Sequence, residues 1–166
     1  MIVALYLLAI VLANLSVATF GPAASIVNAF VFIGLDITAR DRLHEAWQGQ
    51  GLVWKMGLLI LAGSALSALL NIRALPIAVA SCVAFAGAGL ADALVYQLLS
   101  ECAQLVKVNG SNVVSAAVDS VLFPALAFGF PLLVPVMVGQ FAAKIVGGFL
   151  WSLALGGCRA RALAHQ

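Results

Sequence analysis

A few charged and amide side chains stand inside apolar stretches of this sequence. Two are carboxylates, Asp36 and Asp119, and one is the ammonium of Lys144. An ionisable group within an apolar stretch is costly to bury and marks a functional site by default. A carboxylate accepts hydrogen bonds and an ammonium donates them, so the set suits a small, flat, polar molecule better than a bare ion.

Amides and aromatic rings accompany these charges. Asn14 and Asn28 each lie seven residues from Gly21, and Gln140 lies one helical turn before Lys144. In helices leaving Gly21 in opposite directions, the two asparagines would reach equal depth. One stripe of a predicted helix carries Asn112, Ser115, Asp119 and Phe123. Aromatic rings near Asn28 come from Phe30 and Phe32. The candidate binding residues are Asn14, Asn28, Phe32, Asp36, Ser115, Asp119, Gln140 and Lys144.

Structural readings of the same residues stay open. Asn14 and Asn28 are equally explained as interhelical contacts that bond each other. Asp119 and Lys144 also fit a purely structural ion pair. Asp92 is as consistent with an exposed interfacial carboxylate as with a functional one.

The composition requires a membrane around these residues. Hydrophobic residues make up 64% of the 166, charged residues only 8%, and the mean hydropathy is +1.16. A soluble domain is roughly 45–50% apolar and about 25% charged. These values exclude an ordinary soluble enzyme and a disordered chain, and the net charge of +2 is too small for a nucleic-acid binder.

Continuous apolar runs, rather than alternating ones, predict an all-α integral membrane protein. We expect a single transmembrane domain over 1–166 with six membrane-spanning helices and a retained first span rather than a cleaved signal peptide. The breaks include Gly21-Pro22, Asn71-Ile-Arg73, a loop over 101–111 and Pro131. The expected helices are about 2–20, 23–38, 52–70, 75–99, 112–130 and 131–155.

The basic residues set the expected orientation. With six spans, both termini lie on the same side of the membrane. On the opposite side the loops contain a single basic residue, Arg73. The shared side holds Arg40, Arg42, Lys55, Lys107, Arg159 and Arg161. Since basic residues accumulate on the cytoplasmic side, both termini should be cytoplasmic in a cell inner membrane. At about 1.5 Å per residue, Asp36, Asp119 and Lys144 then fall in one layer, about 10 Å from the cytoplasmic edge.

The sequence indicates no enzyme, cofactor or metal. His44-Glu45 lacks the second histidine of a zinc protease motif, and Cys82, Cys102 and Cys158 have no paired spacing. We interpret 40–47 as a solvated amphipathic loop, with Trp47 and Trp54 at the interface. No phosphate-binding Gly-x-x-x-x-Gly-Lys loop is present, so the chain does not itself hydrolyse ATP.

Three stretches, 28–41, 111–123 and 140–144, together resemble the queuosine-precursor transporter (VUT) family. That family has an Asp-x-Thr-like signature closing its second helix, Ser-x-x-x-Asp-Ser/Thr on its fifth and a lysine in its sixth. The matching residues here are Asp36, Ser115, Asp119, Ser120 and Lys144. Where the family often continues with an acidic residue and Tyr-Gly, this chain has Arg40-Asp41 and His44-Glu45-Ala-Trp47, a departure that bears on the substrate.

The resemblance implies a carrier that imports 7-deazaguanine bases (preQ0 or preQ1), with a bundle similar to the S-components of energy-coupling-factor transporters. The partners expected are this small base and the lipid bilayer, with no nucleic acid. A homo-oligomer or an energy-coupling partner remains open, as does the choice of base. Two alternatives remain: an S-component for another vitamin that needs an ATPase module, and a structural membrane protein that transports nothing.

Overall fold

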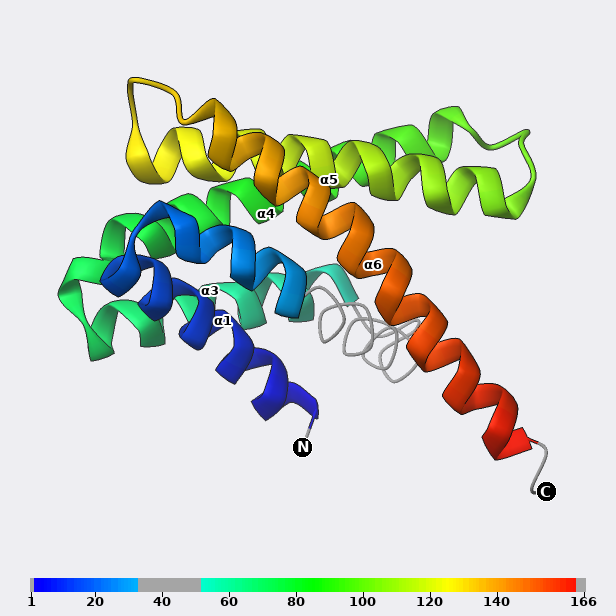
Figure 1. Ribbon diagram of the computed structural model, residues 1–166, viewed down its shortest axis with the longest axis horizontal. Helices are drawn as coiled ribbons and strands as arrows, with labels where there is room; N and C mark the ends of the chain where they lie inside the picture. Colours follow the sequence, from blue (N-terminus) through cyan, green and yellow to red (C-terminus); the bar gives the residue numbers. More distant parts are fainter. Residues whose placement is uncertain (1, 33–51, 164–166) are drawn as a thin grey trace.

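A computed structural model describes residues 2–32 and 52–163 (Figure 1). These residues form six α-helices and a 3-10 helix at Ile72–Ala74, and they contain no strand. The helices are α1 (Ile2–Phe20), the helix Pro22–Phe32, α3 (Leu52–Leu70), α4 (Leu75–Leu98), α5 (Gln104–Phe128) and α6 (Val134–Leu163). The predicted all-α class is confirmed. Asp36 and the segment 40–47 lie outside the described residues.

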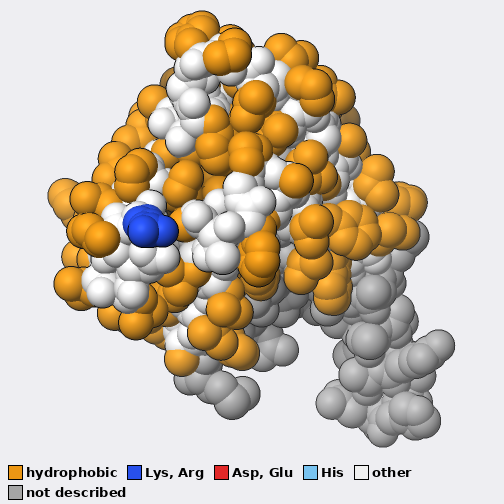
Figure 2. Space-filling model, turned by 60° about the vertical axis from the view of Figure 1, so that its left-hand side comes forward, with side chains coloured by type: hydrophobic (Ala, Val, Ile, Leu, Met, Phe, Trp, Pro, Cys, Tyr) orange, Lys and Arg blue, Asp and Glu red, His pale blue; other side chains and the backbone are white. Residues whose placement is uncertain are grey.

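Four helical segments are long and apolar enough to cross a membrane: Val3–Phe20, Ile72–Leu98, Asn109–Phe128 and Val134–Trp151. The apolar helices Pro22–Phe32 and Trp54–Leu70 are shorter. Large apolar side chains such as Leu8, Leu58 and Leu69 are exposed, and Figure 2 shows one face covered mostly by hydrophobic atoms. An apolar exterior of this extent, on helices long enough to span, is typical of a surface that contacts lipid. The chain is a membrane protein, and the number of six spans stays a prediction.

The first two predicted helix breaks are confirmed. Gly21 has a φ of +78°, a conformation that glycine adopts without steric cost, and its N–H donates to Val17 O at 2.9 Å. The next helix then begins at Pro22. After α3, the Asn71 side chain accepts from Arg73 N at 3.0 Å and caps the 3-10 turn that leads into α4.

Three predicted helix boundaries differ from the structure: the start of α5 and both ends of α6. α5 begins at Gln104, not Asn112, so most of the expected 101–111 loop is helical. Lys107 stabilises this turn: its Nζ donates to Ser100 O at 3.2 Å and lies 5.7 Å from the centroid of the Tyr96 ring. α6 begins after Pro131, at Val134, and reaches Leu163 beyond the expected end near 155. Polar residues interrupt the apolar pattern of the sequence but not the backbone hydrogen bonds of a helix. A helix can therefore continue past the end of its apolar segment.

Small residues let the helices approach closely. A Cβ added at Gly63 on α3 would lie 2.8 Å from Ile10 Cγ2 of α1. One added at Gly139 on α6 would lie 2.7 Å from Ile26 Cδ1 of the helix Pro22–Phe32. Close backbone approach of this kind drives helix packing in membranes. In Figure 1, α4 and α5 lie side by side and α6 crosses them obliquely. α5 and the helix Pro22–Phe32 both contact α6 in its first half, at residues 139–144.

Candidate functional site

A cavity of about 150 Å³ lies where these helices converge. Its lining combines side chains from α1, the helix Pro22–Phe32, α4, α5 and α6. The polar and aromatic lining residues are Asn14, Ser25, Asn28, Phe32, Ser81, Phe85, Asp119, Phe123, Gln140 and Lys144. The remainder are Ala13, Val17 and Ala29, so the cavity is an apolar space with a few polar groups placed around it.

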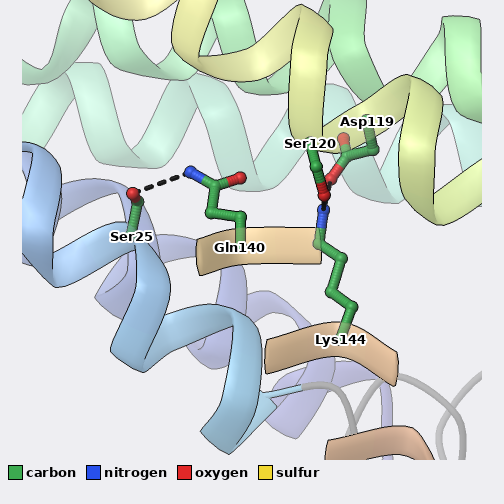
Figure 3. Close-up of polar contacts among 5 residues, drawn as sticks. All are labelled: Ser25, Asp119, Ser120, Gln140 and Lys144. Atoms are coloured by element: carbon green, nitrogen blue, oxygen red, sulfur yellow. Dashed lines mark hydrogen bonds and ion pairs between the residues drawn. The ribbon is translucent and has the colours of Figure 1, made fainter. Parts of the chain in front are cut away.

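The charged part of this lining is an ion pair between α5 and α6 (Figure 3). Lys144 Nζ donates to Asp119 Oδ2 and also to Ser120 Oγ, the latter at 3.3 Å. The side chains of Lys144 and Asp119 are 12% and 18% exposed, so both are largely withdrawn from solvent. The predicted pairing of these two residues across the hairpin of α5 and α6 is confirmed as a contact.

A second polar contact joins α6 to the helix Pro22–Phe32. Gln140 Nε2 donates to Ser25 Oγ at 2.7 Å (Figure 3). The Ser25 hydroxyl in turn donates to Pro22 O. Both side chains are buried. Gln140 lies one turn before Lys144, so a single face of α6 carries both contacts.

Asn14 and Asn28 each bond across helices, but to other partners than expected. Asn14 Nδ2 donates to Ser67 Oγ of α3 at 3.1 Å. Asn28 Nδ2 donates to Ser16 Oγ at 2.7 Å and to Ala13 O at 3.1 Å, both on α1. The direct asparagine pair that we considered is therefore wrong. Each amide serves as an interhelical contact and also lines the cavity, so the two readings do not exclude each other.

Aromatic rings complete the lining. Phe32, Phe85 and Phe123 come from three different helices, and the Phe123 ring meets that of Phe128 edge-on, with centroids 6.1 Å apart. Phe30, also expected at the site, is exposed and does not line the cavity. Two residues apart on a helix, Phe30 and Phe32 face different sides, so only one of them can point inward.

Six of the eight predicted site residues line this one cavity: Asn14, Asn28, Phe32, Asp119, Gln140 and Lys144. Ser115 is half-buried on α5, one turn from Asp119, and is not among the lining residues. Asp36 lies outside the described residues. Asp92 does not line the cavity either; its Oδ1 is buried on α4 and has no hydrogen-bond partner within the described residues.

Ser25, Ser81 and Phe85 line the cavity but were not predicted there. Ser25 precedes Asn28 by three residues, so the two lie on one helix face. Phe85 follows Ser81 by four residues, so these two also lie on one face. This spacing was the available signal. Pro124, buried inside α5, was also missed. Because proline has no N–H, it leaves the Ser120 carbonyl, beside the ion pair, without its usual helical donor.

The site offers hydrogen bonds of both kinds to a ligand. The Lys144 ammonium has three donors, two of which are used in the described contacts. The Asp119 carboxylate and the side-chain carbonyls of Asn14 and Asn28 are acceptors. No group of three or more His, Cys, Asp or Glu side chains that could hold a metal occurs in the described part of the chain. The arrangement can therefore both donate hydrogen bonds to a polar molecule and accept hydrogen bonds from it.

Comparison with known proteins gives one finding at the level of the family. A family model described as "putative vitamin uptake transporter" matches residues 2–155, which is nearly the whole chain. Neither a curated protein nor a solved structure matches this sequence.

Proposed function

The chain belongs to the vitamin uptake transporter family, and from this premise we propose that it imports a 7-deazaguanine base, a precursor of queuosine, through the cavity around Asp119 and Lys144. The observation that carries the proposal is the composition of that cavity. An ion pair, three amides and three phenyl rings line one cavity within an apolar bundle.

The polar groups complement the edge of such a base. A 7-deazaguanine presents two adjacent N–H donors and, beside them, a carbonyl oxygen. A carboxylate accepts a pair of N–H groups in a bidentate manner, as it does from arginine. Asp119 therefore serves as the acceptor for the donor edge, and Lys144 donates to the carbonyl oxygen from the same end of the cavity.

The aromatic rings of the cavity complement the face of the base. Aromatic side chains stack on any nucleobase, and each stacked base contributes about 1–3 kcal/mol in proteins that bind single strands. Phe32, Phe85 and Phe123 supply such surfaces from three helices.

Transport through this site would proceed by alternating access. We place both termini on the cytoplasmic side of the cell inner membrane because the basic loop residues then gather there. Substrate enters from the opposite side and is released inward after the helices around α6 rearrange. Energy comes from a gradient, from metabolic trapping of the base or from a partner protein.

Uptake in cells tests this proposal. The host cannot synthesise queuosine precursors and has no transporter of its own, and it expresses either the wild-type chain or Asp119→Asn. When 7-cyano-7-deazaguanine is supplied, we expect queuosine in tRNA with the wild-type chain and none with the variant. Unmodified tRNA in cells whose membranes contain the wild-type protein would refute the proposal. Uptake that appears only when an ATPase module is co-expressed would instead support the S-component alternative.

A further inference from the structure

The three amides that line the cavity are held in the same way. Each donates an N–H to a serine hydroxyl of a neighbouring helix: Asn14 to Ser67, Asn28 to Ser16 and Gln140 to Ser25. Each serine hydroxyl donates in turn to a backbone carbonyl one turn earlier in its own helix: Ser67 to Gly63 O, Ser16 to Ala13 O and Ser25 to Pro22 O. The same relay of two hydrogen bonds therefore occurs three times around one cavity.

The serine protons decide which way each amide faces. A backbone carbonyl only accepts, so the hydroxyl proton is used there and the hydroxyl oxygen is left to accept from the amide. Only the amide nitrogen can donate to it, which fixes the nitrogen toward the serine and the side-chain carbonyl oxygen toward the other side. Figure 3 shows this for Gln140, whose nitrogen points to Ser25 and whose oxygen points away from it, on the side of Asp119 and Lys144.

The carbonyl oxygens of these amides face the cavity. Asn14 and Gln140 are only 3% and 2% exposed, so their oxygens do not reach the outer surface. Among the described residues, the buried side-chain oxygens without a partner are Ser64 Oγ and Asp92 Oδ1, so the amide oxygens are not sealed against apolar packing. The free space beside the three amides is the cavity that they line. Its wall therefore presents three oriented acceptors in addition to the Asp119 carboxylate.

Asn14 lies at the end of the site that is remote from the ion pair. A second, smaller cavity of about 70 Å³ adjoins the first, and the two share Asn14, Phe32 and Phe85 among their lining residues. Asp119 and Lys144 line the first cavity but not the second. A base whose donor edge lies on Asp119 therefore extends from the ion pair toward Asn14, the amide that borders both cavities.

We propose that the Asn14 carbonyl oxygen accepts the pyrrole N–H of the bound base, and that Ser67 is a positioning residue that holds Asn14 in this orientation. The inference rests on the proposed function, since it assumes that Asp119 binds the donor edge of the six-membered ring. A 7-deazaguanine carries its pyrrole N–H on the five-membered ring, so the two acceptors recognise N–H groups on both rings. The site then rejects a ring that presents an acceptor at the pyrrole position.

A pair of isosteric probes tests this inference on the purified protein. The first is 7-deazaguanine, and the second is its furan isostere, in which an oxygen replaces the pyrrole N–H and the donor edge is unchanged. We expect 7-deazaguanine to bind at least about tenfold more tightly, because the furan oxygen would face the Asn14 oxygen and leave a buried acceptor without a donor. The two probes have nearly the same size, so a steric effect does not produce this ratio.

Ser67→Ala tests the positioning role. Ser67 is 0% exposed and contacts Asn14 without lining the cavity, so the change removes no contact with the base itself. Without the hydroxyl, the Asn14 amide can turn its N–H toward the furan oxygen, and we expect the affinity ratio to fall at least about threefold. Ser64→Ala is the matched control on α3 and should keep the wild-type ratio, because Ser64 Oγ has no partner among the described residues. A general loss of packing would weaken both probes alike and leave the ratio unchanged.

The possible failures are distinguishable. If the wild-type protein binds both probes equally well, the inference is wrong and the proposed function stands. A ratio in Ser67→Ala as large as that of the wild type would likewise overturn it, since Ser67 would then not position Asn14. If no base binds the folded wild-type protein, the proposed function falls and takes this inference with it. The wild-type ratio decides the question even if Ser67→Ala does not fold.

Discussion

Asp119 and Lys144 are the residues whose burial is hardest to explain without a function. Two charges withdrawn from water pay a desolvation cost that their mutual attraction offsets only in good geometry. Here Ser120 Oγ supplies one further contact to the ammonium. An apolar pair of similar volume would pack the hairpin of α5 and α6 without this cost, so we interpret the pair as retained for its ligand.

Removal of one charge should separate the two roles of the pair. We predict that Asp119→Asn abolishes base uptake and lowers the free energy of unfolding, because Lys144 keeps its charge without a carboxylate partner. Breaking a buried pair in this way costs about 3–5 kcal/mol, and less is expected here because both side chains are partly exposed. Adding Lys144→Met should restore the stability but not the uptake. Thermal unfolding in detergent and uptake of labelled base measure both, and transport by the double variant would make the pair purely structural.

The contact between Asn14 and Ser67 gives a second test at this scale. In Ser67→Ala the Asn14 amide loses its acceptor on α3. Hydrogen bonds between membrane helices contribute about 0.6 kcal/mol on average and at most about 1.7 kcal/mol, so we expect a loss within this range. Ser64→Ala is the matched control one turn away, because the buried Ser64 Oγ has no partner among the described residues. Ser67→Ala also removes the bond that Ser67 Oγ donates to Gly63 O at 2.7 Å, so equal unfolding free energies in the two variants would show that the hydroxyl of Ser67 contributes nothing.

The sequence could predict some of these contacts and not others. Asp119 and Lys144 lie on adjacent helices at matching depth, so arithmetic along the chain places them together. Ser67 is 53 residues from Asn14, and α3 is apolar on all sides. Its sequence pattern therefore does not say which side turns toward α1, and the contact is visible only in the structure.

Among the elements, α1 and α3 approach each other closely where Gly63 of α3 lies against Ile10 of α1. Ile10 also lines a smaller cavity of about 70 Å³ beside the first. The ends of helices that stop at Gly21 and Asn71 were predictable because these residues cap or break the backbone ladder locally. The start of α5 was not, because the polar segment before Asn112 has the composition of a loop although it is helical from Gln104.

A pair of glycine substitutions in α3 tests the importance of this approach. A Cβ at Gly63 would lie 2.8 Å from Cγ2 and 3.0 Å from Cβ of Ile10, atoms that cannot swing aside freely. We predict that Gly63→Ala lowers the unfolding free energy by about 1–3 kcal/mol, the usual cost of overpacking. Gly57→Ala, where nothing lies within 4 Å, should be neutral or stabilising since alanine favours helix. The melting temperatures of both variants decide it, and an unchanged value for Gly63→Ala would contradict the close contact.

At the scale of the whole molecule, the arrangement of apolar and polar residues is the reverse of that in a soluble bundle. Large apolar side chains cover the outside, while the amides, hydroxyls and the ion pair gather around an internal cavity. Composition alone predicted this membrane environment. It did not predict the shape of the cavity or its division into two parts, since both depend on how six helices rotate and cross.

The central claim is that this internal cavity binds a 7-deazaguanine base, and an experimental structure determined with 7-cyano-7-deazaguanine tests it most directly. We predict density for a flat bicyclic ring in the cavity, with its donor edge within hydrogen-bond distance of the Asp119 carboxylate and its face against the rings of Phe32, Phe85 or Phe123. An empty cavity at a saturating concentration of the base, or the base bound elsewhere on the protein, would contradict the claim.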